Sequence, residues 1–407
     1  MTDVTRLLDL KFGLHSSVTD FTSTPATVTT IQPRSIPPVM RPSREFIARE
    51  LYSVDGRRFP HVRGRQALAA INCNMEMRGV NSNTGAAVAD WEAKMEQGRM
   101  LAALFGAVAT ASTGAAPTAS GTAGATLTVS TTVIVNGDII LFTTSAGTFI
   151  RQVTSGGGTT TLTLDRAASG TASGTVIRLA QYSLATATTG HVHGYFRSEF
   201  ENSRTDFYGC AAMSGELVIP NSGLVEFNST WMPTSWADIA EANPTYAAPT
   251  AGNPIVSAGS SFYIGATSYM VRNLRLRIDN GMSERTSTTG TNGVVGYVAA
   301  AAAVKSAILE GELYVGNNTG SIGEVVDDSG TPALGAITGD ADNAGVVAGT
   351  YDVALQVGVD AGASMYVRIP AADMTGTVQD GGGLKVLKFS AAATAPSSGS
   401  PFYLGVA

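Results

Sequence analysis

Residues that could bind a metal ion are few in this chain, and their spacing is poor. His191 and His193 are two residues apart on a predicted strand, so both side chains point to the same side. A zinc site needs further ligands, so the pattern favours two polar strand residues over a metal site. Asp340 and Asp342 are spaced like the first ligands of a calcium loop, but the last ligand position holds Tyr351 instead of Glu. We therefore expect no metal, and we interpret the acidic segment as a solvated loop.

Motifs for nucleophilic, phosphate-binding and redox chemistry are also missing. The adjacent carboxylates Asp327 and Asp328 would point apart in an extended loop, which makes them a poor pair for acid–base catalysis. The sequence contains no Gly-x-Ser-x-Gly elbow, no Gly-Lys dipeptide of a phosphate-binding loop, and no HExxH or CxxC motif. It therefore predicts neither an enzyme nor a cofactor.

The chain of 407 residues carries few charges for its size. Charged residues make up 14% of it, against about 25% in an average protein, and it contains 46 glycines. The net charge of −6 argues against sequence-independent DNA binding, because that function needs a basic surface to displace counterions from phosphates. Much of the surface must therefore consist of Ser, Thr, Gly and Ala, or be covered by other subunits.

The cysteines and the apolar segments narrow the class further. Cys73 and Cys210 are the two cysteines, which excludes a disulfide framework and predicts buried free thiols. The longest apolar run, over 294–303, is too short to span a bilayer, and we expect no secretion signal.

The first hundred residues predict an extended arm followed by two helices. Residues 1–44 are rich in Thr and Pro, which indicates an arm that is loose or laid across a partner. The segment 44–52 has the pattern of a short amphipathic helix. Helical spacing of apolar residues is clearest over 86–106, where Gly106 suits the end of a helix and Gly98 interrupts its middle. We expect this helix to cover one face of a sheet.

Strand patterns dominate the rest of the chain. Short strands separated by Gly and Ser clusters over 118–182 predict a small inserted β module. The segment 271–278 alternates cleanly and ends in a turn at Asp279-Asn280-Gly281. The pattern Leu-x-Ile-x-Asn occurs over 217–221 and again over 276–280, which is either an internal hairpin repeat or a coincidence.

Arginine is strongly preferred over lysine among the basic residues. Only five of the 26 are Lys, and Arg suits interfaces because its planar fork forms bidentate pairs with carboxylates. Arg272, Arg275 and Arg277 lie on one predicted strand, with Glu284 and Arg285 just past its turn. We interpret these five residues as candidates for a salt-bridged subunit interface, while an ordinary polar strand face stays open as the alternative.

Four stretches in chain order resemble the tail tube proteins of long-tailed bacteriophages, the siphovirus-type major tail proteins. They are GRRFPHVRGRQALAAINCNMEMRGVN followed by WEAKMEQGRMLAALFGA, then FYGCAAMSGELVIPNSGLVEFNSTWMPT, then SYMVRNLRLRIDNGMSERTS, and finally the strands from GTYDVALQVGVDAGASMYVRIP to SGSPFYLGVA. The resemblance covers most of the chain outside 1–40 and 118–182. Its order along the chain is more specific than any one motif.

The resemblance implies a β-sandwich or barrel with one flanking helix, a long N-terminal arm and an inserted β module. The tail tube domain would comprise 45–117 and 183–407. Six subunits would form a ring by closing a shared barrel, and stacked rings would form a channel for ejection of the genome into the host bacterium. Net negative charge repeated six times would let DNA slide without specific binding.

The resemblance also implies partners, a location and contact residues. A tape measure protein and tail terminator or initiator proteins would bind the tube, which would be assembled in the bacterial cytoplasm and end in the virion tail, without a membrane. We expect the module 118–182 on the tube exterior, and the arm and the loop 316–348 at ring-to-ring contacts. The acidic candidates for ring contact or for the lumen are Glu324, Asp327, Asp328, Asp340 and Asp342.

Two other classes of function stay open. Another phage structural component, such as a capsid or head decoration protein, is one of them, although a capsid protein normally needs a longer helix. A secreted β-rich adhesion or carbohydrate-binding module is the other. Exposed aromatic residues would favour that module, yet aromatics make up only 7% of the chain.

Overall fold

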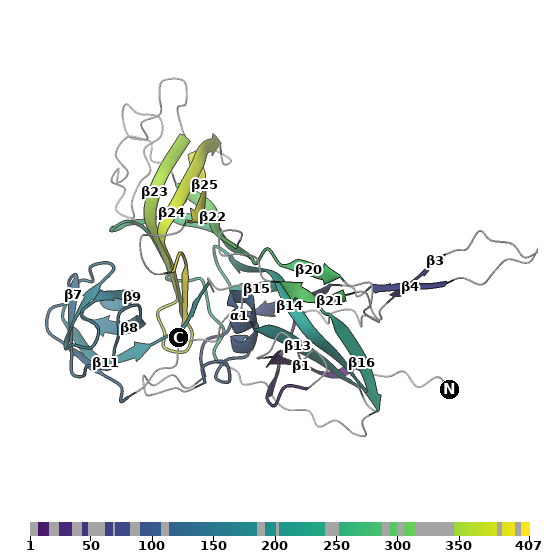
Figure 1. The fold of residues 1–407 in the computed structure, drawn as a ribbon. Coiled ribbons are helices and arrows are strands. Elements are labelled where there is room, and N and C mark those ends of the chain that lie inside the picture. The colour runs from purple at the N-terminus through teal and green to yellow at the C-terminus, as the bar shows by residue number, and fades with distance from the viewer. Residues whose placement is uncertain are drawn as a thin grey trace, which may run out of the picture.

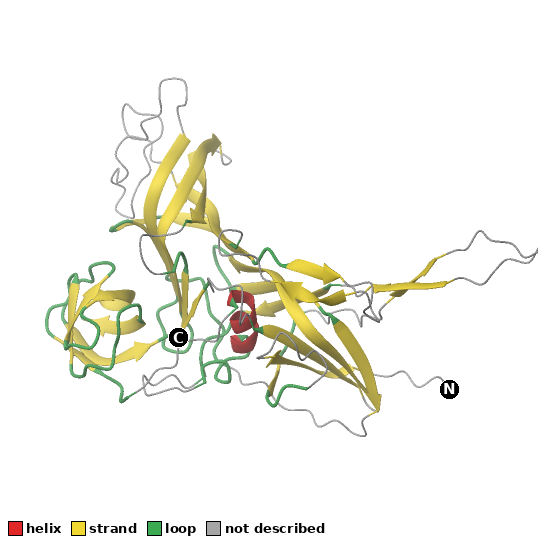
Figure 2. Ribbon diagram, in the orientation of Figure 1, coloured by secondary structure: helices red, strands yellow, loops and turns green. Residues whose placement is uncertain are grey.

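The computed structural model describes most of the chain. The described residues are 7–15, 24–34, 43–47, 62–67, 70–81, 90–106, 114–184, 192–200, 203–240, 252–286, 294–298, 305–314, 346–380, 385–394 and 400–407. They are mainly β, as the sequence predicts, and α1 (Gly98–Phe105) is the helix found among them (Figure 2). Within these ranges, no helix is long and apolar enough to cross a membrane.

Among the described residues, sixteen strands join in one hydrogen-bonded sheet (Figure 1). These strands are β1 (Leu7–His15), β2 (Val28–Thr30), β5 (Ile71–Glu76), β12 (Ala180–Ser183), β13 (His193–Phe200), β14 (Ser203–Ile219), β15 (Glu226–Met232), β16 (Ser235–Ala240), β17 (Ser261–Ile264), β18 (Thr267–Tyr269), β19 (Val271–Asp279), β22 (Ser306–Tyr314), β23 (Val346–Val357), β24 (Met365–Asp380), β25 (Lys385–Ala393) and β26 (Tyr403–Val406). A continuous path of antiparallel neighbours runs β5-β15-β14-β19-β22-β25-β24-β23.

Ten further strands form a closed barrel and two hairpins. The barrel consists of β6 (Thr118–Ser120), β7 (Thr126–Val129), β8 (Ile139–Thr144), β9 (Gly147–Ser155), β10 (Thr161–Leu164) and β11 (Ala172–Arg178). The hairpins pair β3 (Ser43–Ile47) with β4 (Val62–Ala67), and β20 (Ser283–Thr286) with β21 (Val294–Val298). In Figure 1 the barrel lies beside β23 and β24, while β3 and β4 point away on the opposite side.

The main apolar core lies on the buried face of the sheet and includes the apolar residues of α1. The alternation predicted over 271–278 is confirmed, because Leu274, Leu276 and Ile278 are buried while Arg275 and Arg277 are exposed. The barrel has a separate apolar interior. Both cysteines are buried and free, as expected, and burial raises the pKa of Cys73 to about 12.

The N-terminal arm is in part a strand pair of the main sheet. Strand β1 pairs along its length with β13, and β2 pairs with β1. Phe12 has no exposed surface, and its ring lies 4.8 Å from Phe196 and 5.0 Å from Trp231. The prolines that suggested an arm begin at Pro25, after this strand has ended. The expectation of an arm that is loose or laid across a partner is therefore wrong for 7–15 and 28–30, which pair within the chain.

Both predicted helices need correction. Residues 43–47 form strand β3 through pairing with β4, and the rest of the expected helix lies outside the described residues. The second helix begins at Gly98, not near 86, because the chain turns back at 91–97. A Cβ on Gly98 would lie 2.7 Å from the Cα of Glu92, so glycine permits this close approach. The helix ends at Gly106, as predicted, with a φ of 84°.

Helix α1 packs against the neighbouring strands β1, β13 and β14 of the main sheet, as expected, and the fold also covers its other side. All eight of its residues are buried, and it contacts β1, β12, β13 and β14. A helix that is buried on all sides has no solvent face, so α1 is enclosed by the fold as well as packed on the sheet.

A buried histidine pair joins β1 to β13 and makes stability sensitive to acid. His15 and His193 are cross-strand partners, and the ring of His15 lies 5.7 Å from Tyr195 and 6.4 Å from Tyr208. Burial, with a smaller effect from His15, lowers the pKa of His193 from 6.5 to about 4. As the pH falls, His193 is protonated in the unfolded chain at a higher pH than in the folded chain. The free energy of unfolding therefore decreases between about pH 6.5 and pH 4.

We expect the wild-type chain to lose about 2 kcal/mol of unfolding free energy at this site between pH 7 and pH 4.5. Urea unfolding at the two pH values, compared with the His193→Gln variant, measures this loss. The variant should show a smaller drop by that amount. Equal drops in both proteins would contradict the assignment to His193.

Candidate functional site

Polar side chains dominate the exposed side of the sheet across six strands. We call it the polar face, and it consists of Asn72, Asn74, Glu216, Asn228, Thr230, Arg275, Arg277, Glu310, Glu312 and Lys388. Part of it is a shallow concavity lined by β5, β15, β14, β19 and β22. These residues share one side because successive side chains of a strand alternate between faces.

The predicted arginines lie on this surface and are paired within the chain. Arg275 Nε lies 3.1 Å from Glu216 Oε1 on β14, and Arg277 Nη1 lies 3.9 Å from Glu310 Oε2 on β22. Their side chains stay 51% and 60% exposed, so each pair contributes little to stability. Their main effect is to neutralise the positive charge of the surface, because a neighbouring strand places a carboxylate beside each guanidinium.

Arg272 joins the same surface because of a β-bulge. Asn273 has a φ of 55°, in the left-handed region, and the pairing of β19 with β22 shifts register between Arg272 and Arg275. Arg272 thereby pairs with Glu312 at 2.6 Å and Arg275 lies opposite Glu310. The side chain of Asn221 accepts a hydrogen bond of 2.8 Å from the Asn273 backbone N–H, which holds the bulge.

Other predicted site residues are not placed by the structure. Glu284 and Arg285 belong to β20, but their side chains are outside the described part. His191 and the acidic residues Glu324, Asp327, Asp328, Asp340 and Asp342 also lie outside the described residues. Within the described ranges, no group of His, Cys, Asp or Glu side chains could hold a metal ion. Whether the arginines contact a second subunit stays a prediction.

A second group of interacting residues lies at the junction between the barrel and the sheet, and the sequence did not predict it. The barrel packs on the sheet through an apolar cluster that contains residues from both. Its members are Ile139, Leu141, Ile150, Ile177, Leu179, Ala354, Tyr366 and Ala407.

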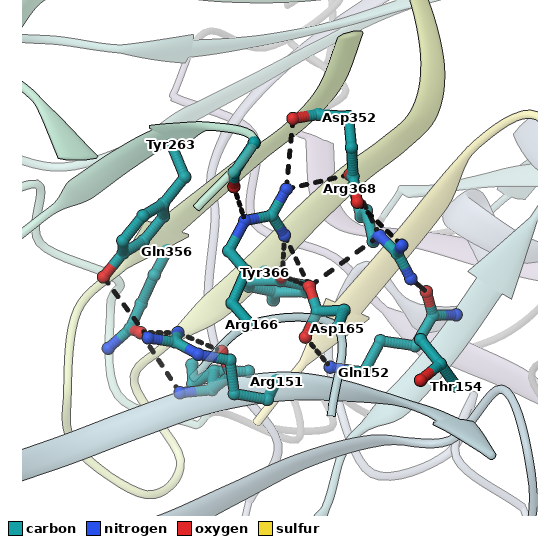
Figure 3. Close-up of polar contacts among 12 residues, drawn as sticks. Arg151, Gln152, Thr154, Asp165, Arg166, Tyr263, Asp352, Gln356, Tyr366 and Arg368 are labelled. Carbon is teal, nitrogen blue, oxygen red and sulfur yellow. Dashed lines mark hydrogen bonds and ion pairs between the residues drawn. The ribbon is translucent and has the colours of Figure 1, made fainter. Parts of the chain in front are cut away.

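A buried ion-pair network lies beside this cluster (Figure 3). Arg166 Nη1 lies 2.5 Å from Asp165 Oδ2, and Arg166 Nη2 lies 2.8 Å from Asp352 Oδ1 on β23. Arg368 on β24 holds the other oxygen of Asp352 at 2.8 Å, and the Tyr366 hydroxyl donates to Asp165 at 2.5 Å. Burial, followed by the charge of Asp165, raises the pKa of Tyr366 well above its ordinary value. Charges of the barrel and the sheet thus pair across the junction, with Asp165 and Arg166 shielded from water and Asp352 partly exposed.

Arg151 is the third guanidinium of the junction, and aromatic rings cover it. Its Cζ lies 5.1 Å from the ring centres of both Phe149 and Tyr263. Its Nη1 donates to the Ile150 carbonyl at 2.7 Å and to Gln356 Oε1 at 3.4 Å. Cation–π contact and carbonyl acceptors stabilise this weakly hydrated cation, which is only 1% exposed.

Three of the five charged residues of the barrel, Arg151, Asp165 and Arg166, lie at the junction. Residues 118–178 contain five charged side chains, Asp138, Arg151, Asp165, Arg166 and Arg178, and none of them is exposed. The exposed residues of the barrel are dominated by Thr and Ser. The small number of charged residues in this segment is the sequence feature that could have indicated buried ion pairs there.

Comparisons with known proteins give no family for this chain. No family model matches it, and a search of curated proteins found no match.

Proposed function

We propose that this chain is the structural subunit of a bacteriophage tail tube, forming hexameric rings that stack around a channel for DNA. The observation that carries the proposal is the charge pairing on the polar face. A surface along which DNA slides must avoid fixed phosphate contacts, because each basic contact adds affinity through counterion release. Among the described residues of the polar face, every Arg and Lys has a carboxylate within 4 Å. In this proposal the polar face meets the passing DNA.

The buried junction supports a structural role for the inserted barrel. Ion pairs and apolar contacts hold it on β23 and β24, so it cannot swing freely. Its neutral, hydroxyl-rich exposed surface suits an exterior position, away from DNA. The proposal therefore places the barrel outside the tube.

Negative-stain electron microscopy of the purified protein tests the proposal. We expect rings or tubes with a central channel wide enough for duplex DNA, and with the barrel on the outer surface. Assemblies without a channel, or a barrel that fills the channel, would contradict it.

A charge variant tests whether ion pairing keeps the surface from gripping DNA. Substituting Glu216→Gln and Glu310→Gln together frees Arg275 and Arg277, so we expect salt-sensitive DNA binding that the wild type lacks. The control is Asp360→Asn with Asp373→Asn, which removes two exposed carboxylates that form no ion pair with the residues that the structure describes. Filter binding of duplex DNA at low salt measures the difference. Equal binding by both double variants would contradict this role for the polar face.

A further inference from the structure

Strand β5 is the outermost strand at one end of the sheet path. Within the described residues it pairs with β15 alone. On the side of β15, the Met77 N–H donates to the carbonyl of Val225, the residue before β15. On the opposite side, the Asn74 carbonyl accepts a hydrogen bond from the Arg34 N–H. Backbone groups of one residue point the same way, so Asn72, Asn74 and Glu76 present theirs outward. An edge of this kind is a ready site for pairing with another strand.

A short segment, Ile31–Arg34, lies on this edge, and we call it the strap. Ile31 anchors it, since its side chain is 2% exposed and its N–H donates to Leu10 O at 2.9 Å. The next N–H, of Gln32, donates to the Glu96 carboxylate. At the far end, the Arg34 N–H donates to Asn74 O at 2.7 Å and the Arg34 guanidinium pairs with Glu226.

The strap covers the edge only weakly. Between its anchor and Arg34 stands Pro33, which has no N–H and cannot continue a ladder of hydrogen bonds. Arg34 itself is exposed, so its contact amounts to one backbone hydrogen bond and one surface ion pair. The Gln97 side chain caps Glu76 O, while the outward N–H groups of Asn72 and Asn74 have no strand beside them in the described residues.

The opposite end of the same sheet path also has an open stretch. Strand β23 pairs with β24 over Val346–Val357, but β17 covers only Val353–Gln356 on its other side. In the described part of the chain, no strand pairs with the outer side of Val346–Thr350. The two ends of this path thus offer two different open stretches, and a head-to-tail ring of identical subunits needs two different surfaces on each subunit.

We propose that the edge of β5 receives the Val346–Thr350 edge of a second copy of this chain, and that the strap guards the β5 edge until then. The inference rests on the proposed function, which requires identical subunits to join. Displacing Arg34 from this edge sacrifices one backbone hydrogen bond and one ion pair, whereas the incoming strand supplies a ladder of several hydrogen bonds. The guard therefore slows premature pairing without preventing assembly.

The guard is tested by the Arg34→Pro variant. This substitution removes the N–H that donates to the Asn74 carbonyl and the positive charge that pairs with Glu226. It leaves the hydrogen bond and the burial of Ile31 intact. We expect assembly at about a tenfold lower protein concentration than for wild type, measured by sedimentation velocity. Arg34→Lys is the matched control, because it keeps the N–H and the charge, and it should assemble like wild type. An unchanged concentration for Arg34→Pro would overturn the guarding role.

The edge itself is tested by Asn74→Pro, with Asn74→Ala as the control. Proline removes an outward N–H that has no partner among the described residues, so the monomer should keep its circular dichroism spectrum. We expect Asn74→Pro to stay monomeric, alone or combined with Arg34→Pro, while Asn74→Ala assembles. Normal tubes from Asn74→Pro would overturn the inference and leave the proposed function standing. Loss of assembly in Asn74→Pro, with wild-type assemblies that lack a channel, would support the inference and refute the proposed function.

Discussion

Replacing Arg166 by Met lowers the free energy of unfolding by about 3 kcal/mol, because it strands a carboxylate in the junction. The Asp165 side chain has no exposed surface, and Arg166 is its nearest cation, at 2.5 Å. Arg368 lies 3.7 Å away and also holds Asp352, so it compensates only in part. The same substitution removes the tie of 2.8 Å between the barrel and β23. The barrel should therefore loosen as the stability falls.

Urea unfolding followed by circular dichroism measures the loss, and limited proteolysis around 114–117 and 184 reports loosening of the barrel. The control is Arg275→Met, the same change at an ion pair whose Arg side chain is 51% exposed. We expect less than about 1 kcal/mol there and no change in cleavage. Equal losses at the two positions would show that the junction does not depend on buried charge pairing.

The features that could be predicted from the sequence are those set by neighbouring residues. Alternation over 271–278 identified a half-buried strand, and Gly106 marked the end of the helix. Local spacing could not locate the start of α1, because Trp91 and Met95 are buried in turns and continue the apolar pattern. Periodicity reports burial, and here burial extends beyond the helix.

In each ion pair of the polar face, the sequence predicts the arginine but not its carboxylate partner. The sequence identifies Arg272, Arg275 and Arg277 as partners for carboxylates, but it does not identify Glu216, Glu310 and Glu312 as the carboxylates within the chain. The junction was not predicted, because Arg166 and Asp352 are 186 residues apart and meet only through sheet topology. Long-range pairs of this kind leave no local pattern in a single sequence.

Asn280 is the position where local reasoning and tertiary structure differ most. It was predicted as a turn residue that tolerates positive φ, yet Gly281 has the positive φ, of 54°, and the side chain of Asn280 is fully buried. Its Nδ2 donates to Leu104 O at 2.6 Å and to Ala212 O at 3.0 Å. One amide group thus joins the last turn of α1 to β14.

Substituting Asn280→Asp should cost about 4 kcal/mol at pH 7, because an acceptor with a negative charge then faces two carbonyl oxygens in the core. Burial and these oxygens raise the pKa of the new carboxyl in the folded state, so the deficit relative to wild type shrinks as the pH falls towards about 4. The matched control is Asn221→Asp, the same change in an exposed turn, where the acceptor for Asn273 N–H is kept. Urea unfolding at pH 7 and pH 4.5, each compared with wild type at the same pH, gives both quantities. If Asn280→Asp were as mild as Asn221→Asp, the amide could not be the link between α1 and β14, and apolar contacts alone would have to hold the enclosed helix in place.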